Sequence, residues 1–106
     1  MPTQVVPWTN GRVRYATSTP AGGGTTDPVW VDWEGRRPLS VAVFPQGGTA
    51  RVEYTLDDRQ AVDGGSALWV PWQEGDVTQA TANAIEGPVT ALRMVSSAAA
   101  DLRVLG

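Results

Sequence analysis

Acidic side chains are the residues of this chain whose type and spacing come closest to a chemical site. Asp57, Asp58 and Asp63 share one segment with two glycines, and oxygen-rich turns of this kind can bind Ca²⁺. The spacing is not that of an EF-hand loop, and Asp and Gly are also ordinary turn residues. Asp32 and Glu34 would share one face of a strand, but a glycosidase pair needs carboxylates facing each other in a cleft. We predict no metal site and no catalytic residue.

The residue types that are missing exclude most other enzyme chemistry. The chain of 106 residues contains no Lys, His or Cys, the side chains that most often transfer protons or attack a substrate. Without His and Cys it has no zinc ligand set, and no Ser has a His to activate it. The three glycines at 22–24 are not followed by the Lys of a phosphate-binding loop. We therefore expect a non-enzymatic protein with no cofactor.

The five tryptophans are the strongest candidates for binding residues. Trp30 and Trp33 form a W-V-x-W motif that Trp69 and Trp72 repeat, and residues three apart on a strand point to opposite faces. One Trp of each pair can be in the core while the other stacks on a sugar ring or anchors a protein partner. We predict a protein interface that includes the apolar N-terminal residues. The predicted contacts are Val5, Val6, Trp8, Trp30, Trp33, Trp69 and Trp72.

The charge pattern limits the kinds of partner. The formal net charge is −3, and among the scattered arginines only Arg36 and Arg37 are adjacent. Binding to phosphate backbones needs a basic patch, so we expect no nucleic acid partner. No apolar run approaches the length of a membrane span, and the first residues lack the pattern of a signal peptide. We expect neither a membrane partner nor a secretion signal.

The elements that must position these residues are predicted to be strands, because Val, Thr and aromatic residues are abundant. Segment 45–48 and segment 96–99 each predict a hairpin turn, Pro71 predicts an edge strand, and 57–66 predicts a polar loop. Residues 76–84 predict a loop or a short strand, since their interior holds weak helix formers. The predicted strands are 12–16, 29–33, 39–44, 49–56, 68–72, 89–95 and 100–105.

The two predicted hairpins are similar to each other. In an ungapped comparison, Phe44 meets Met94 and Val52 meets Leu102. A shared period of two in any pair of hairpins would also give this match, so duplication stays one of two explanations. Either way we predict an all-β fold, an antiparallel β-sandwich of the jelly-roll or immunoglobulin-like kind. We expect residues 1–28 to form a flexible N-terminal arm with a Gly-rich loop, and 29–106 to form the sandwich domain.

Four runs of strand and turn residues carry a resemblance to a known group of proteins. They are GTARVEY at 48–54, ALWVPW at 67–72, GDVT at 75–78 and GPVTALR at 87–93. These runs resemble small virion proteins of tailed bacteriophages over roughly the C-terminal two thirds of the chain; the first 28 residues are not covered. The resemblance implies a β-sandwich or jelly-roll module without catalytic residues.

The function that this resemblance implies is that of a virion structural protein. We expect a capsid decoration (cement) protein on the capsid exterior, made in the host cytoplasm, which binds the major capsid protein as a homo-oligomer, a dimer or a trimer. A neck or tail adaptor or a fibre module, contacting other virion proteins, is an alternative within the same class. A carbohydrate-binding β-sandwich module is an alternative from another class, and it would require exposed, coplanar Trp rings on one face.

Overall fold

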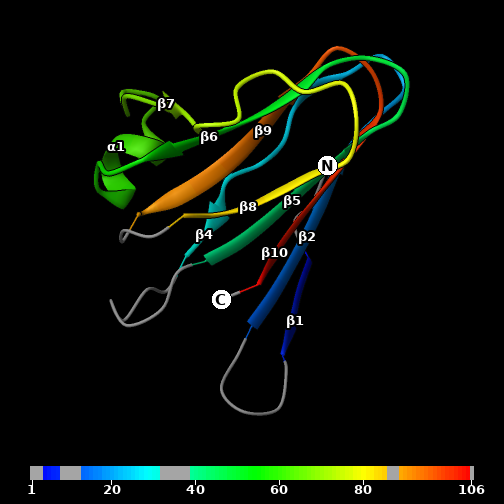
Figure 1. Ribbon diagram of the computed structural model, residues 1–106. Coiled ribbons are helices and arrows are strands. Elements are labelled where there is room, and N and C mark those ends of the chain that lie inside the picture. The colour runs from blue at the N-terminus through cyan, green and yellow to red at the C-terminus, as the bar shows by residue number, and fades with distance from the viewer. Residues whose placement is uncertain (1–3, 8–12, 32–38, 86–88, 106) are drawn as a thin grey trace.

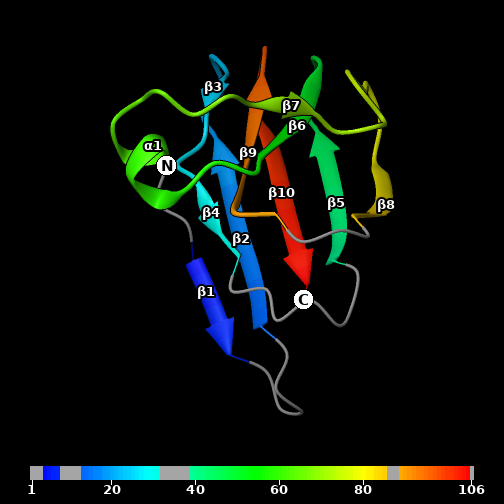
Figure 2. The ribbon, with the colours of Figure 1, turned by 90° about the vertical axis from the view of Figure 1, so that its left-hand side faces the viewer.

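The computed structural model describes residues 4–7, 13–31, 39–85 and 89–105, with side chains from residue 15 onward. These residues form two antiparallel sheets that pack face to face, which confirms the predicted all-β sandwich (Figure 1). The first sheet has the order β1, β2, β10, β5, β8, and Figure 2 shows β2, β10 and β5 side by side. The second sheet has the order β3, β9, β6, β7, and β4 also pairs with β9.

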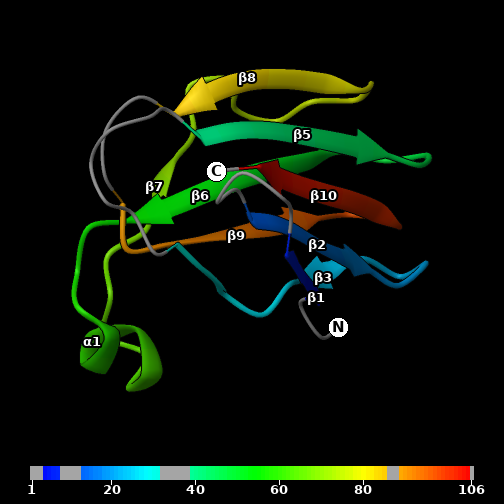
Figure 3. The same cartoon turned by 90° about the horizontal axis from the view of Figure 1, so that it is seen from below.

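The strands are short, as the density of turn residues requires. The first sheet contains β1 (Gln4–Pro7), β2 (Val13–Thr19), β5 (Leu39–Pro45), β8 (Thr81–Ile85) and β10 (Ala100–Leu105). The second sheet contains β3 (Gly24–Thr25), β4 (Val29–Trp30), β6 (Ala50–Thr55), β7 (Val70–Pro71) and β9 (Ala91–Ser96). One short helix, α1 (Arg59–Asp63), lies at a corner of the molecule away from most of the strands (Figure 3).

The core lies between the sheets and is built by alternation along the central strands. Val41 and Val43 of β5 and Leu102 of β10 face Val52 of β6 and Met94 of β9, and all five are fully buried. Each such side chain contributes about 1.5–3 kcal/mol of apolar transfer free energy. The intervening residues of these strands point away from the core, so each sheet has an inner face and an outer face.

The two predicted hairpins are wrong, because consecutive strands lie in different sheets. β5 pairs with β10, with Val43 opposite Leu102, while β6 pairs with β9, with Val52 opposite Met94. The turns after β5 and β9 therefore carry the chain across the sandwich from one sheet to the other (Figure 1). The opposite sheet covers the apolar face of an alternating strand, whichever strand is its neighbour within its own sheet. Alternation alone therefore does not decide which strands pair.

The two units that cross between the sheets, β5 with β6 and β9 with β10, have similar strand pairings. Their first strands match, however, with a shift of one residue. Val52 and Leu102 are equivalent and both buried, as the ungapped comparison predicts. Phe44 is exposed on the outer face, however, whereas Met94 is in the core. Matching Val43 with Met94 instead restores the agreement, and the observed pairings of the two units then superpose.

Residues 13–28 differ from the expected arm. β2 lies between β1 and β10 in the first sheet, and β3 pairs with β9 in the second. Thr17 and Thr19 of β2 are buried beside Tyr15. The Thr19 hydroxyl lies 2.6 Å from the Ser96 hydroxyl in the other sheet and accepts a 3.0 Å hydrogen bond from the Ala100 amide. An inward face of threonines lacks the apolar signal of a core strand, which explains the difference.

Three turns meet at the end of the sandwich away from α1 (Figure 1). The Gly23 amide donates to the Pro20 carbonyl at 2.8 Å, and Gly23 has a positive φ of 79°. The Ser97 amide donates to the Thr49 carbonyl at 2.9 Å, which joins the turns after β5 and β9. Close backbone packing at this end therefore depends on residues without a side chain.

Three local predictions can be compared directly with the structure. Residues 76–80 are irregular and Thr81 begins β8, which agrees with the predicted loop or short strand. The predicted strand at 68–72 is confined to Val70–Pro71 and is an edge strand, as its proline indicated. The predicted polar loop contains α1, whose N-cap is Asp58: its carboxylate accepts a hydrogen bond from the Ala61 amide at 2.8 Å.

Candidate functional site

The outer face of the second sheet carries two of the predicted interface tryptophans. Trp30 of β4 is opposite Ala91 of β9, which is itself opposite Thr55 of β6, so the three residues form one row across the sheet. The guanidinium of Arg59, at the start of α1, lies 4.1 Å from the centre of the Trp30 ring. This cation–π contact attaches α1 to the sheet. Trp30 is half-buried as a result.

Trp69 makes the equivalent contact near the other edge of this sheet. The guanidinium of Arg93 lies 4.3 Å from the centre of the Trp69 ring, and Trp69 is also half-buried. Each of the two rings therefore already has a guanidinium against it. A sugar that stacked on either ring would have to use the face opposite the guanidinium.

Glu53 binds two arginines on this face, and one of them, Arg93, also packs on Trp69. The Glu53 side chain is only 8% exposed, and its carboxylate oxygens lie 2.9 Å from Nε of Arg51 and 2.7 Å from Nε of Arg93. Burial raises the pKa of the Glu53 carboxyl, but hydrogen bonds from Arg51 and Arg93 and their positive charges outweigh it, so the pKa lies below its ordinary value. At neutral pH the Glu53 carboxylate is thus ionised, and it joins Arg51 of β6 to Arg93 of β9 on the outer face.

The lowered pKa of Glu53 predicts how stability depends on pH. Because the folded pKa is below the unfolded value of 4.5, the stabilisation is complete above that value and is lost as pH falls through the folded pKa. We expect Glu53→Gln to lower the free energy of unfolding at pH 7 by about 1.5–3 kcal/mol, the range for hydrogen bonds to charged groups. Urea unfolding between pH 3 and pH 7 measures both effects.

The pH series also separates Glu53 from the other carboxylates. The E53Q protein should lose less stability than the wild type as pH is lowered below about 4.5, since its largest acid-sensitive contact is already gone. Asp63→Asn, on the exposed side of α1, is the matched control and should keep the wild-type slope. An E53Q slope equal to that of the wild type would contradict this account.

Trp72 is in the core, in contrast to its predicted role as a contact residue. It is 3% exposed, and its amide donates to the Val52 carbonyl at 2.8 Å. Trp69 and Trp72 thus point to opposite faces, as their spacing predicts. The indole Nε1 of Trp72 is buried and has no hydrogen-bond partner among the described residues. An aromatic ring of this size is held here by packing alone.

A set of exposed apolar side chains lies next to Trp69 on the other side of the same edge. Leu56, Leu68 and Val70, here called the leucine patch, are 67%, 77% and 43% exposed. Val70 is opposite Tyr54, and continuing this register places Leu68 opposite Leu56. The Leu68 amide donates to an Asp57 carboxylate oxygen at 2.7 Å, which holds the two segments together. The three side chains therefore come from two neighbouring segments at this edge of the sheet.

The remaining predicted contacts are only partly visible. Val5 and Val6 lie in β1, opposite Tyr15 and Arg14 of β2, so their backbone belongs to the first sheet. Their side chains, and all of Trp8 and Trp33, lie outside the described residues. The sequence analysis missed the leucine patch. Two leucines on either side of a short Asp- and Gly-rich segment were the available signal.

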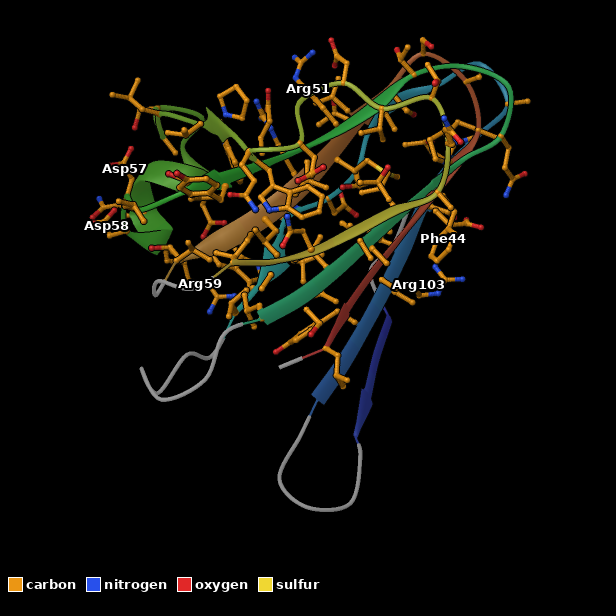
Figure 4. The ribbon with its side chains drawn as sticks, viewed as in Figure 1. Phe44, Arg51, Asp57, Asp58, Arg59 and Arg103 are labelled. Atoms are coloured by element: carbon orange, nitrogen blue, oxygen red, sulfur yellow. The ribbon has the colours of Figure 1, made fainter. Side chains whose placement is uncertain are left out.

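Other kinds of site find little support in the described part of the chain. It contains no group of three or more acidic residues arranged to hold a metal ion. Asp57 and Asp58 instead bind the backbone amides of Leu68 and Ala61. No helix in the described ranges is long and apolar enough to cross a membrane. Figure 4 shows Asp57, Asp58 and Arg59 together at the α1 corner, far from Phe44 and Arg103.

The fold and the leucine patch together define an antiparallel β-sandwich with an exposed apolar corner. Comparison with known proteins gives no match to a family model, to a curated protein or to a solved structure.

Proposed function

We propose that this protein is a non-enzymatic structural protein of a bacteriophage virion, a decoration protein that binds the assembled capsid shell. The leucine patch is the observation that carries the proposal. Large apolar side chains gathered at one place on a surface typify sites of association. In the described part of the molecule, three of the four large hydrophobic side chains that are exposed belong to this patch.

The leucine patch has enough apolar surface to act as an anchor. A Leu or Val side chain contributes about 1.5–3 kcal/mol when it passes from water into a packed interface. The Asp57 bond to the Leu68 amide and the packing of Arg59 on Trp30 hold the surrounding segment in place. Because little conformational freedom remains to be lost, more of this free energy is available for binding.

The charges around the patch indicate the chemistry of the partner. Asp58 and Asp63 are exposed on the segment between Leu56 and Leu68. An acidic rim favours a partner with an apolar cleft bordered by Arg or Lys, and it disfavours acidic partners. A seam between neighbouring capsid subunits offers such a cleft only after assembly, and a protein that binds only the assembled form stabilises it by mass action.

Co-sedimentation with capsid shells tests this proposal. Shells assembled from the major capsid protein of the same genome should bind the wild-type protein. The double substitution Leu56→Asp and Leu68→Asp should weaken binding by at least about 100-fold, since it places charges in an apolar contact. The control is Gln79→Asp with Ala80→Asp, which adds the same charge at two exposed positions before β8.

The possible outcomes of this assay separate the alternatives. The control protein should bind as the wild type does, and all variants should keep the wild-type melting temperature. Failure of the wild type to sediment with shells, or equal binding of the L56D/L68D protein, would contradict the proposal. Binding to purified tails in place of shells would identify the neck or tail alternative.

A further inference from the structure

We propose that the outer face of the first sheet is the contact surface between two copies of this chain. This surface is separate from the leucine patch, so its test is independent of the proposed function. In Figure 4, Phe44 and Arg103 mark this face on the right side of the view, away from the Asp57, Asp58 and Arg59 corner. Its exposed side chains come from the two central strands, β5 and β10.

The face has one projecting side chain and one hollow. Phe44, near the end of β5, is 41% exposed and is the only aromatic side chain among the large exposed hydrophobic residues of the described part of the chain. Beside it lies an open hollow of about 500 Å³, lined mainly by Ser40, Ala42, Ala82, Arg103 and Leu105. A single surface therefore presents both a knob and a depression of suitable size for an aromatic ring.

The face also carries one positive and one negative charge on the same strand. Asp101 is opposite Phe44, and Arg103 is opposite Ala42 on one side and Ala16 on the other. Asp101 accepts a 3.1 Å hydrogen bond from Gln46 through Oδ2, which leaves Oδ1 available. Among the described side chains, no carboxylate forms an ion pair with Arg103, whose Nη1 donates to the Leu102 carbonyl at 3.1 Å.

A two-fold axis brings these features together. The axis runs across the strands, in the plane of the contact, at the level of Leu102. It sets Asp101 of each copy against Arg103 of the second copy, because the two residues lie on either side of Leu102 on the same strand. The same operation places each Phe44 over Ala42 of the second copy, at the mouth of the hollow. Such a contact is self-complementary, as a closed dimer requires.

The small residues of the face make the close approach feasible. Stacked sheets lie about 10 Å apart when their facing side chains interlock. Ala16, Ala42 and Ala82 lie in one row with Arg103 across the sheet, and their small side chains leave room for the aromatic ring of the second copy. The leucine patch remains exposed in this dimer, so each dimer would present two leucine patches to a partner.

Analytical ultracentrifugation over about 1–300 µM, the range suited to an interface of modest size, tests the proposal. The wild-type protein should show a reversible monomer–dimer equilibrium. Asp101→Arg alone and Arg103→Asp alone should each weaken dimerisation by about 10-fold or more, because each sets like charges against each other. The double variant D101R/R103D should return the dimer dissociation constant to within about 3-fold of the wild type.

Two further variants test whether the dimer depends on this face and not on the leucine patch. Phe44→Arg should give a monomer with the far-UV circular dichroism and melting temperature of a folded protein. The L56D/L68D protein should remain a dimer whatever its binding to shells. A wild type that stays monomeric across the whole range overturns the proposal, and so does a charge exchange that fails to restore a dimer weakened by the single substitutions.

Discussion

Replacing Trp72 with alanine is expected to lower the free energy of unfolding by about 3–5 kcal/mol. Trp72 is 3% exposed and belongs to the core cluster that joins the two sheets. Removing the indole leaves a cavity that the surrounding β-strands cannot close without breaking their hydrogen bonds, including the one from the Trp72 amide to Val52. Equilibrium unfolding in urea or guanidinium chloride, followed by circular dichroism, measures the loss.

Phenylalanine at position 72 is the matched control for this prediction. No acceptor in the described part of the chain bonds the Nε1 group of Trp72, so removing this group leaves none of those acceptors without a donor. We expect Trp72→Phe to cost about 1–2 kcal/mol, mainly for the smaller ring. A loss for W72F as large as that for W72A would show that the indole N–H, and not the volume of the ring, stabilises the core.

Replacing Gly23 with alanine is expected to destabilise the protein by about 2–4 kcal/mol. A Cβ atom on Gly23 would lie 2.5 Å from the Ser96 carbonyl oxygen and 2.6 Å from the Ser97 carbonyl carbon. Both atoms are backbone, so the turn after β9 would have to move. The φ angle of 79° adds strain for any residue with a side chain. Thermal unfolding should show a drop of about 4–8 °C for each kcal/mol.

The neighbouring glycine provides the control for this substitution. A Cβ atom on Gly22 would meet nothing within 4 Å, and its φ is not in the left-handed region. We expect Gly22→Ala to be neutral or to stabilise by up to about 1 kcal/mol, because it restricts the unfolded chain. Equal effects of G22A and G23A on the melting temperature would contradict the close approach of the turns at 20–23 and 96–99.

The sequence predicts well which face of each strand is buried, because alternation is a local property. Val52 and Tyr54 face inward in β6, as the period of two along a strand requires. Trp72 and Trp69 point to opposite sides, as their spacing predicts. Strand pairing is not local. The turn at 45–48 could have joined neighbours in one sheet, but it crosses between sheets, and only the mutual fit of all the strands decides between these outcomes.

The candidate site could be predicted only in part for a related reason. Alternation places Leu56 on the same side as Val52 and Tyr54, and so predicts that it is buried. The structure exposes it because the two sheets diverge toward the α1 corner (Figure 1), which leaves the end of this face without a partner. Whether Leu56 is buried or exposed therefore depends on the shape of the whole sandwich and not on the local sequence pattern. Trp30 and Trp69 were identified as candidates, but their arginine partners come from distant segments.

The pairing of β2 with β10 has a consequence for the synthesis of this protein. Thr19 and Ala100, which are joined in the first sheet, are 81 residues apart along the chain. A ribosome adds about 5–20 residues per second, so β2 waits for several seconds before the strand that completes its sheet has been made. Resistance of the nascent chain to proteases should therefore arise in a single late step, once segment 100–105 has emerged, and not strand by strand.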